Sequence, residues 1–209
     1  MATELTDIIG PVLPPGEPEL RAVAISSLTG SVTLDGVSGG LGNELDRELL
    51  LSLRDWADVV LVGARTVVAE NYAGTRASCL AIVSRTLRLG DRPLDDTIIL
   101  TPRSSLADAP TDLSPAELVP ADSPEEMIRA LHDRGLKRIA CEGGPGVFDM
   151  MFGADLVDVL HLTVAPLISA PVEKHLVNGV NRWVSLEHHS ATDDGTLFLR
   201  YRRSARELR

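Results

Sequence analysis

Short runs of hydrophobic residues recur along the chain, separated by segments of mixed polarity. Three of them, DVVLVG (58–63), CLAIVS (79–84) and DTIIL (96–100), are hydrophobic almost throughout. Runs of this length and composition are typical of strands that are buried on both faces of a parallel sheet. Two further strands are predicted at residues 21–28 and 137–142.

Helical patterns lie between these strands. Residues 43–57 repeat leucine at helical spacing, and Asn43 stands where a helix cap is expected, with Asp46 at the capping-box position. A second helix is predicted from Ser123, which is followed by a proline and two glutamates, to about residue 135. A short helix should follow the glycines at 143–146 and end near residue 153.

The end of the chain returns to strand patterns. Residues 157–168 form a long hydrophobic strand pattern, and residues 182–203 are predicted as a β-hairpin that turns near Asp194 and Gly195. Strands that alternate with helices and end in a hairpin indicate a three-layer α/β fold with a mixed, mostly parallel central sheet. We expect residues 1–19, which contain four prolines, to be an irregular lead-in, and residues 20–209 to form a single domain.

Composition narrows the possible partners and the location. The 209 residues carry a net charge of −10, which disfavours nucleic acid and anionic membranes as partners. Cys79 and Cys141 lie in hydrophobic runs without zinc-type spacing, so they are expected to be reduced thiols. No charged leader opens the chain, and no hydrophobic run reaches about 18 residues. A cytoplasmic protein without a membrane segment is therefore predicted.

The histidines do not suggest a metal site. His188 and His189 are neighbours in a predicted strand, where successive side chains point to opposite faces, so one metal ion could hardly bind both. His161 lies inside the long hydrophobic strand and is expected to be a satisfied core or interface residue. We therefore predict no metal.

Three junctions at the carboxyl ends of predicted strands are candidates for ligand binding, because open α/β sheets bind ligands at that edge. They are residues 63–66, 84–86 and 142–146. At the third junction, Gly143 and Gly144 come directly before a predicted helix, whose N-terminus favours a phosphate. The alternative is that these glycines only make a tight turn, and the segment lacks the dinucleotide fingerprint G-x-G-x-x-G.

The second junction indicates which nucleotide would bind. Arg85 stands between two hydroxyl residues, and a guanidinium beside hydroxyls suits the 2′-phosphate of NADPH. A solvated arginine at a strand end is the alternative.

Four segments of the chain together resemble the RibD C-terminal family, the reductase domain of riboflavin biosynthesis. They are RAVAISSLTGSVTLDGVSGGLG (21–42), DVVLVGARTVVAENY (58–72), CEGGPGVFDMMFGADLVDVLHLTVAPLI (141–168) and GTLFLRYRR (195–203). The resemblance implies a dihydrofolate-reductase-like fold. It also implies an NADPH-dependent reductase that converts 5-amino-6-(5-phosphoribosylamino)uracil, a pyrimidine, into its ribitylamino product.

The resemblance assigns roles to individual residues. Those that match the family's two cofactor loops and its adenosine 2′-phosphate site are Gly63, Thr66, Ser84, Arg85, Gly143, Gly144, Pro145 and Gly146. Those on the substrate side are Ser27, Gly30, Asp35, Ser38 and Gly39. Glu142 is the candidate catalytic acid, because a proton must reach the substrate nitrogen when hydride reaches the sugar carbon. The alternative is that Glu142 accepts backbone N–H groups and holds its loop.

The sequence departs from the family pattern at three positions. Thr29 replaces an aspartate, Val23 stands where a polar residue is common, and Arg65 replaces a small residue. Two other functions therefore stay open: the same fold and cofactor acting on a pterin or another heterocycle, and an NADPH-binding homologue without turnover. A homodimer is also predicted, because the strand at 157–168 and a hairpin containing Trp183, Leu197, Phe198 and Leu199 offer more hydrophobic surface than one domain easily covers.

Overall fold

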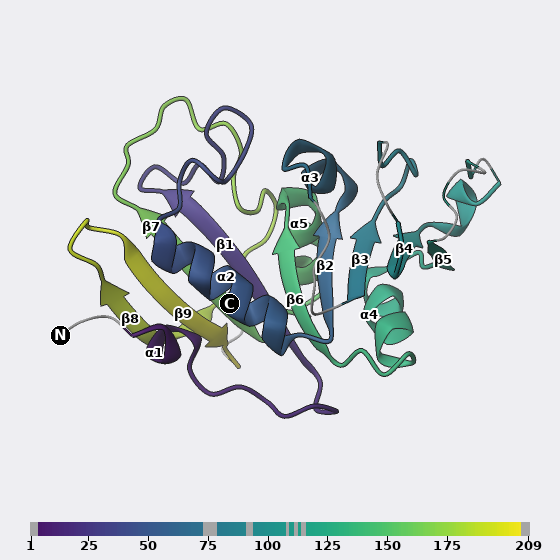
Figure 1. The fold of residues 1–209 in the computed structure, drawn as a ribbon, viewed down its shortest axis with the longest axis horizontal. Coiled ribbons are helices and arrows are strands. Elements are labelled where there is room, and N and C mark those ends of the chain that lie inside the picture. Colours follow the sequence, from purple (N-terminus) through teal and green to yellow (C-terminus); the bar gives the residue numbers. More distant parts are fainter. Residues whose placement is uncertain are drawn as a thin grey trace.

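A computed structural model gives the fold and describes residues 4–72, 79–90, 94–107, 109–110, 113 and 116–205. The strands are β1 (Glu19–Ser27), β2 (Val59–Gly63), β3 (Cys79–Val83), β4 (Thr97–Thr101), β5 (Glu117–Pro120), β6 (Arg138–Gly143), β7 (Val159–Ala165), β8 (Val184–Ala191) and β9 (Leu197–Arg203). Within the described residues they form one nine-stranded sheet in the order β5-β4-β3-β2-β6-β1-β7-β9-β8 (Figure 1). Each neighbouring pair is parallel except the two pairs that β9 makes.

Helices cover both faces of this sheet. They are α1 (Leu5–Ile9), α2 (Glu44–Trp56), α3 (Ala64–Ala69), α4 (Pro124–His132) and α5 (Pro145–Gly153), with a short 3₁₀ helix at Arg103–Ser105. The helices α4 and α5 pack with Leu61 and Ile139 on one face, whereas α1 and α2 pack with Phe198 on the other. Figure 1 shows α2 lying across the front of the sheet. The predicted three-layer α/β fold with a mostly parallel sheet and a C-terminal hairpin is confirmed.

The local signals identified the main elements correctly. The side chain of Asn43 accepts the Asp46 amide at 3.0 Å and caps α2, and Ser123 accepts the Glu126 amide at 3.2 Å and caps α4. The β2 residues Val59–Val62 are fully buried, as a strand covered on both faces should be. The sequence pattern missed α3 and β5, which are only six and four residues long.

The prediction that residues 1–19 are irregular is wrong in part, because α1 lies within them and its Ile8 is buried. Two buried arginines bind the carbonyl end of this helix. Arg21 donates to the Ile9 carbonyl at 2.9 Å, and Arg200 donates to the Asp7 and Ile8 carbonyls at 2.7 and 2.8 Å. These charge-assisted bonds hold α1 against the sheet, at the helix end where a cation is favoured.

Two buried titratable side chains belong to the core. Burial, together with the charges of Arg21 and Arg200, lowers the pKa of His161 to about 3, so its ring is neutral at physiological pH. Burial raises the pKa of the Cys141 thiol to about 12, which keeps it protonated and unreactive. His161 is 1% exposed, so its predicted place in the core is confirmed. Among the described residues, however, its Nδ1 has no hydrogen-bond partner, so the histidine is not fully satisfied there.

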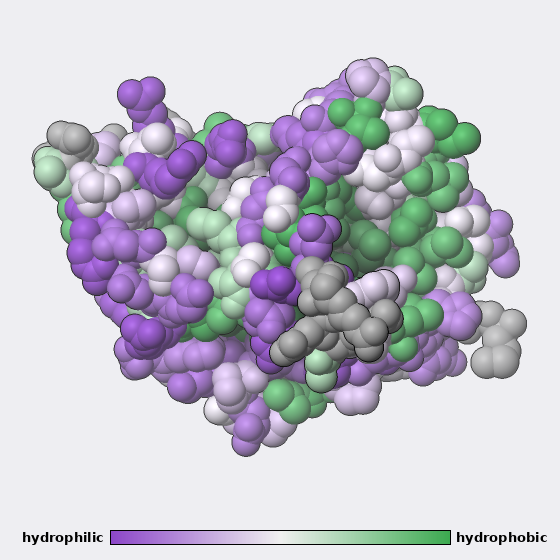
Figure 2. Space-filling view, turned by 180° about the vertical axis from the view of Figure 1, so that it is seen from behind, coloured by the Kyte–Doolittle hydropathy of each residue, from purple (hydrophilic) through white to green (hydrophobic). Residues whose placement is uncertain are grey.

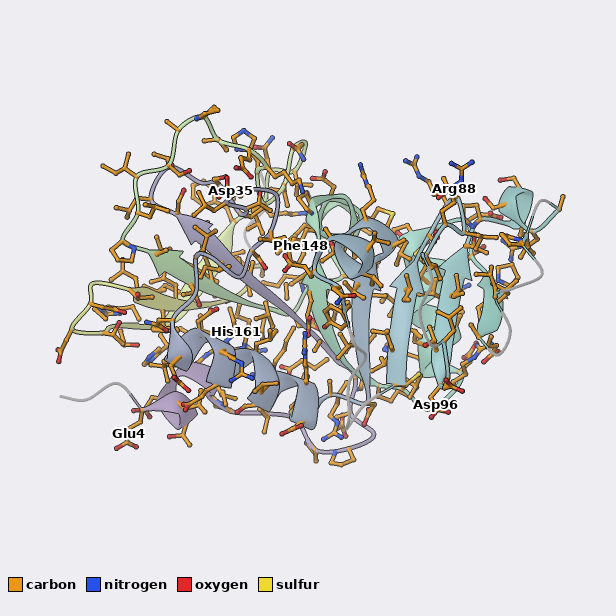
Figure 3. All side chains as sticks on the ribbon, turned by 45° about the horizontal axis from the view of Figure 1, so that its top comes forward. Glu4, Asp35, Arg88, Asp96, Phe148 and His161 are labelled. Atoms are coloured by element: carbon orange, nitrogen blue, oxygen red, sulfur yellow. The ribbon has the colours of Figure 1, made fainter. Side chains whose placement is uncertain are left out.

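The parallel strands direct the candidate loops to one edge of the sheet. Figure 3 shows Asp35, Phe148 and Arg88 at this edge, whereas Asp96 and Glu4 lie at the opposite edge. Because β2, β3 and β6 are parallel neighbours, the loops that follow them lie close together.

Candidate active site

The first and third predicted junctions meet in the structure. In the sheet, Val62 pairs with Gly143. A Cβ atom built on Gly63 would lie 3.5 Å from the Gly143 carbonyl oxygen, and the Gly144 amide donates to the Thr66 hydroxyl at 2.9 Å. Residues from two loops more than 70 positions apart therefore form one surface at the N-terminus of α5.

Positions 143 and 144 are glycine for different physical reasons. Gly143 has a φ of 77°, and a Cβ there would lie 2.4 Å from Phe148 Cε2, so backbone conformation and packing both require glycine. Gly144 has an ordinary φ of −72°, and its Cβ would meet only the Thr66 hydroxyl, at 2.7 Å. The backbone of the turn and the packing of Phe148 therefore require glycine at position 143. At position 144, the close approach of the Thr66 hydroxyl favours glycine.

The residues at this helix end fit a phosphate group. The helix begins with Pro145, and its N-terminus carries partial positive charge. Gly146 is exposed, and the nearest atom to a Cβ built on it is Arg65 Nη2, at 3.9 Å. Arg65, a departure from the family pattern, thus adds a cation beside the loop.

The second junction supplies further cations. Arg85 is exposed, and its carbonyl accepts the Ser105 hydroxyl at 2.7 Å. Ser84 is buried, and its hydroxyl accepts the Leu87 amide at 2.9 Å, so it shapes the loop. Arg88, which the sequence reasoning missed, is also exposed and lies at the same edge of the sheet (Figure 3). The sequence feature that could have identified it is its position three residues after Arg85.

The Glu142 carboxylate has side-chain partners. Arg54 from α2 donates to it twice, from Nε at 2.6 Å and from Nη2 at 2.7 Å, and the Tyr72 hydroxyl donates as well. The Arg54 guanidinium also stacks on the Tyr72 ring, 4.7 Å from its centroid. Burial and the Glu142 charge raise the pKa of Tyr72, so its hydroxyl stays protonated. The bidentate ion pair holds the Glu142 carboxylate at the start of the loop at residues 142–146.

The β1 end of the predicted substrate side is held by internal hydrogen bonds. Ser27 is buried, and its hydroxyl accepts the Ser31 amide at 3.0 Å. Gly30 adopts a φ of 90° in this turn. Thr29, which replaces the family's aspartate, donates its hydroxyl to the Ser169 carbonyl at 2.6 Å and so ties this loop to another one.

The rest of the predicted substrate side is a surface loop with a turn at Asp35 and Gly36, both of which have a positive φ. Asp35 and Gly39 are exposed, and no atom of the part of the chain that the structure describes lies within 4 Å of a Cβ built on Gly39. Ser38 donates both its amide and its hydroxyl to the Glu70 carboxylate, at 2.7 and 3.0 Å. Glu70 therefore joins the substrate side to the helix that follows β2.

A second carboxyl group, which the sequence places only at a capping-box position, lies near this side. Asp46 on α2 is half-buried, and burial raises its pKa although a hydrogen bond from the Thr163 hydroxyl partly offsets that effect. A Cβ built on Gly42 would lie only 2.6 Å from Asp46 Oδ2, so glycine makes room for this carboxyl group. The signal in the sequence was an acid on the first turn of the helix that follows the substrate loop.

Within the described ranges, no group of three His, Cys, Asp or Glu side chains is arranged to hold a metal ion. In the same part of the chain, no helix is long and hydrophobic enough to cross a membrane.

The arrangement defines a class of protein: an α/β domain of the dihydrofolate-reductase type, in which the loops at 63–66 and 142–146 meet at the carboxyl ends of the parallel strands. The chain belongs to the RibD C-terminal domain family, whose model matches residues 18–197. No curated protein is similar enough to be matched.

Solved structures agree with this assignment. A pyrimidine reductase-like protein from Corynebacterium diphtheriae is 30% identical, with a TM-score of 0.81 over 98% of this chain and 100% of that one. The deaminase/reductase from Thermotoga maritima is 21% identical, with a TM-score of 0.74 over 90% of this chain and 57% of that one. The riboflavin biosynthesis reductase Rib7 from Saccharomyces cerevisiae is 15% identical, with a TM-score of 0.69 over 96% of each chain. The last two likenesses show the fold alone.

Proposed function

We propose that this chain is an NADPH-dependent reductase of a pyrimidine riboflavin precursor, 5-amino-6-(5-phosphoribosylamino)uracil. The family, and the likeness to a pyrimidine reductase-like protein, support a reductase. The observation that carries the proposal is the hydrogen bond from the Gly144 amide to the Thr66 hydroxyl, which brings two candidate loops together at the N-terminus of α5. It offers backbone amides, a helix dipole and the Arg65 guanidinium to a pyrophosphate.

Each part of the site has a role in this proposal. NADPH, when bound, supplies a hydride. Gly144, Pro145 and Gly146 hold its pyrophosphate, and Arg85 pairs with its 2′-phosphate. The substrate lies between this junction and the loop at 29–42, where the opened sugar imine takes the hydride on carbon and a proton on nitrogen. Glu142 stays our candidate for the catalytic acid, but as a carboxylate paired with Arg54 it must take up a proton from water before it gives one to the nitrogen. Its ion pair with Arg54 also gives it a positioning role.

A specific observation favours a second candidate, the reduction of a pterin. The Asp46 carboxyl group lies beside the Thr163 hydroxyl and next to Gly42. A half-buried carboxylate can accept two parallel hydrogen bonds from the ring N–H and amino group of a 2-aminopyrimidine, as in a pterin. The acid that the family carries at position 29 is absent here, so in this second candidate the half-buried Asp46, rather than the exposed Asp35, is the carboxyl group that binds the ring.

Steady-state NADPH oxidation with the ribosylaminouracil and with a dihydropterin tests both candidates. Turnover of the first alone supports the leading proposal, and turnover of the second alone replaces it. Tight NADPH binding without turnover of either would identify a binding protein.

Arg85→Ala is expected to weaken NADPH binding about tenfold or more, because a hydrogen bond between charged groups contributes about 1.5 to 3 kcal/mol. NADH lacks the 2′-phosphate, so its affinity should barely change. Dissociation constants for both cofactors measure this. Arg129, which is exposed on α4, is the matched control, and Arg129→Ala should change neither constant. Equal losses for NADPH and NADH would contradict the assignment of Arg85.

We also propose a homodimer through the exposed side of the hairpin. Trp183, Val184, Leu186 and Leu197 are 46%, 37%, 52% and 37% exposed there, and Figure 2 shows hydrophobic residues on that side of the back face. Phe198, which we expected to contribute, is instead buried beneath α2. Light scattering should give about twice 22.4 kDa at micromolar concentration. Leu186→Glu should give the monomer mass, and a monomeric wild type would refute the proposal.

A cytoplasmic location stays a prediction. The protonated, buried thiol of Cys141 is compatible with a reducing compartment.

A further inference from the structure

Two carboxylates hold the loop at residues 29–42 from different sides. Glu173 accepts the Thr33 hydroxyl at 2.9 Å and the amides of Asp35 and Gly36 at 2.8 and 3.0 Å. Glu70 accepts both the amide and the hydroxyl of Ser38. Glu173 comes from the segment after β7, whereas Glu70 is the C-cap of α3 on the cofactor side.

A continuous path of hydrogen bonds leads from the Glu70 contact to the phosphate junction. The Gly144 amide donates to the Thr66 hydroxyl at 2.9 Å. One helical turn later, the Glu70 amide donates to the Thr66 carbonyl at 2.9 Å, and the Glu70 carboxylate then receives Ser38. A single short helix thus contacts the cofactor loop at one end and the substrate loop at the other.

We propose that Glu70 is a positioning residue that couples cofactor binding to the order of the substrate loop, an inference that rests on the proposed binding of NADPH. With the cofactor bound, α3 and Glu70 hold Ser38 and its neighbours in the geometry that receives the substrate. The loop is more mobile without the cofactor, and cofactor therefore binds before substrate.

The coupling has a physical cause at Gly144. A phosphate at the α5 N-terminus takes the Gly144 amide, which the Thr66 hydroxyl otherwise accepts. Thr66 then turns its own O–H donor toward the phosphate oxygen, which is the stronger, charged acceptor. This charge-assisted contact replaces the weaker Gly144–Thr66 bond in the bound state, so it restrains α3 more strongly and, through the helical turn, the Glu70 carboxylate.

Hydrogen–deuterium exchange of the full chain, with NADPH as the only added ligand, tests the coupling. In the wild type, NADPH should slow exchange at residues 143–148 and also at residues 37–41, by about tenfold at the Ser38 amide. In Glu70→Ala, NADPH should slow exchange only at 143–148. Glu70→Gln keeps an acceptor oxygen for Ser38 and should retain part of the effect.

Glu173→Ala is the matched control, because it frees the same loop without touching α3. It should speed exchange at residues 33–36 equally with and without NADPH, and leave the NADPH effect at Ser38 intact. Protection at 143–148 without protection at 37–41 in the wild type would overturn the coupling alone. Full protection of Ser38 in Glu70→Ala would also overturn it. If NADPH protects neither segment, both the coupling and the proposed function are wrong.

Discussion

Glu142→Ala is expected to lower the unfolding free energy by about 2 to 4 kcal/mol, because it leaves the partly buried Arg54 charge without its partner. The Arg54 and Glu142 side chains are 19% and 7% exposed, so water can replace only part of the lost interaction. Arg54 keeps its contact with Tyr72, which places the expected loss below that of a fully buried pair. Urea unfolding at neutral pH measures the change.

A double-mutant cycle separates the ion pair from other effects of each substitution. Arg54→Leu combined with Glu142→Ala should be more stable than the sum of the two single losses predicts, by about 1 kcal/mol or more. Tyr72→Phe removes only one hydroxyl and should cost about 1 kcal/mol. Strictly additive losses for Arg54 and Glu142 would show that their contact contributes little to stability.

Glu142→Gln distinguishes positioning from proton donation, because it keeps the shape of the side chain and removes the charge. If Glu142 chiefly positions the cofactor loop, NADPH binding should weaken and the turnover number should fall modestly at saturating NADPH. If Glu142 gives the proton, NADPH binding should stay near normal while turnover falls by about a hundredfold or more.

The parallel core could be predicted because its strands carry their own signal. Fully buried strand segments such as Val59–Val62 must be hydrophobic at every position, and the caps at Asn43 and Ser123 depend on neighbours within three residues. The missed elements lack such signals. Ala64–Ala69 makes less than two helical turns, and Glu117–Pro120 is an edge strand in which only Val119 is buried.

For the candidate site, the sequence could predict only which loops follow the carboxyl ends of parallel strands. That 63–66 and 142–146 lie at the same edge follows from the parallel pattern, but their direct contact depends on the strand order β2-β6, which one sequence does not specify. The pairing of Arg54 with Glu142 joins residues 88 positions apart. The hydrogen bond between Asp46 and Thr163 likewise joins two residues that are far apart in the sequence.

Gly143→Ala is expected to destabilise the protein by about 2 to 4 kcal/mol, independently of any ligand. Alanine is strained at a φ of 77°, and its methyl group would overlap the Phe148 ring. Gly144→Ala should cost only about 1 kcal/mol, because its backbone is ordinary and the methyl group displaces just the Thr66 hydroxyl. Melting temperatures of the two variants without ligand measure the difference, and equal losses would contradict it.

Variants of Gly144 and Thr66 test whether the loop at residues 142–146 binds a pyrophosphate. Gly144→Ala also removes the Thr66 hydrogen bond, so its effect on NADPH is compared with that of Thr66→Ala. The double variant Gly144→Ala/Thr66→Ala removes the hydroxyl that the new methyl group would meet, so its stability without ligand should match that of Thr66→Ala. Its affinity for NADPH should nevertheless be lower than that of Thr66→Ala by about tenfold or more, because the methyl group then occupies the space of a phosphate oxygen that accepts the Gly144 amide. Isothermal titration of the three variants with NADPH measures this. A double variant that binds NADPH as well as Thr66→Ala does would show that Gly144 serves the turn and that the pyrophosphate binds elsewhere.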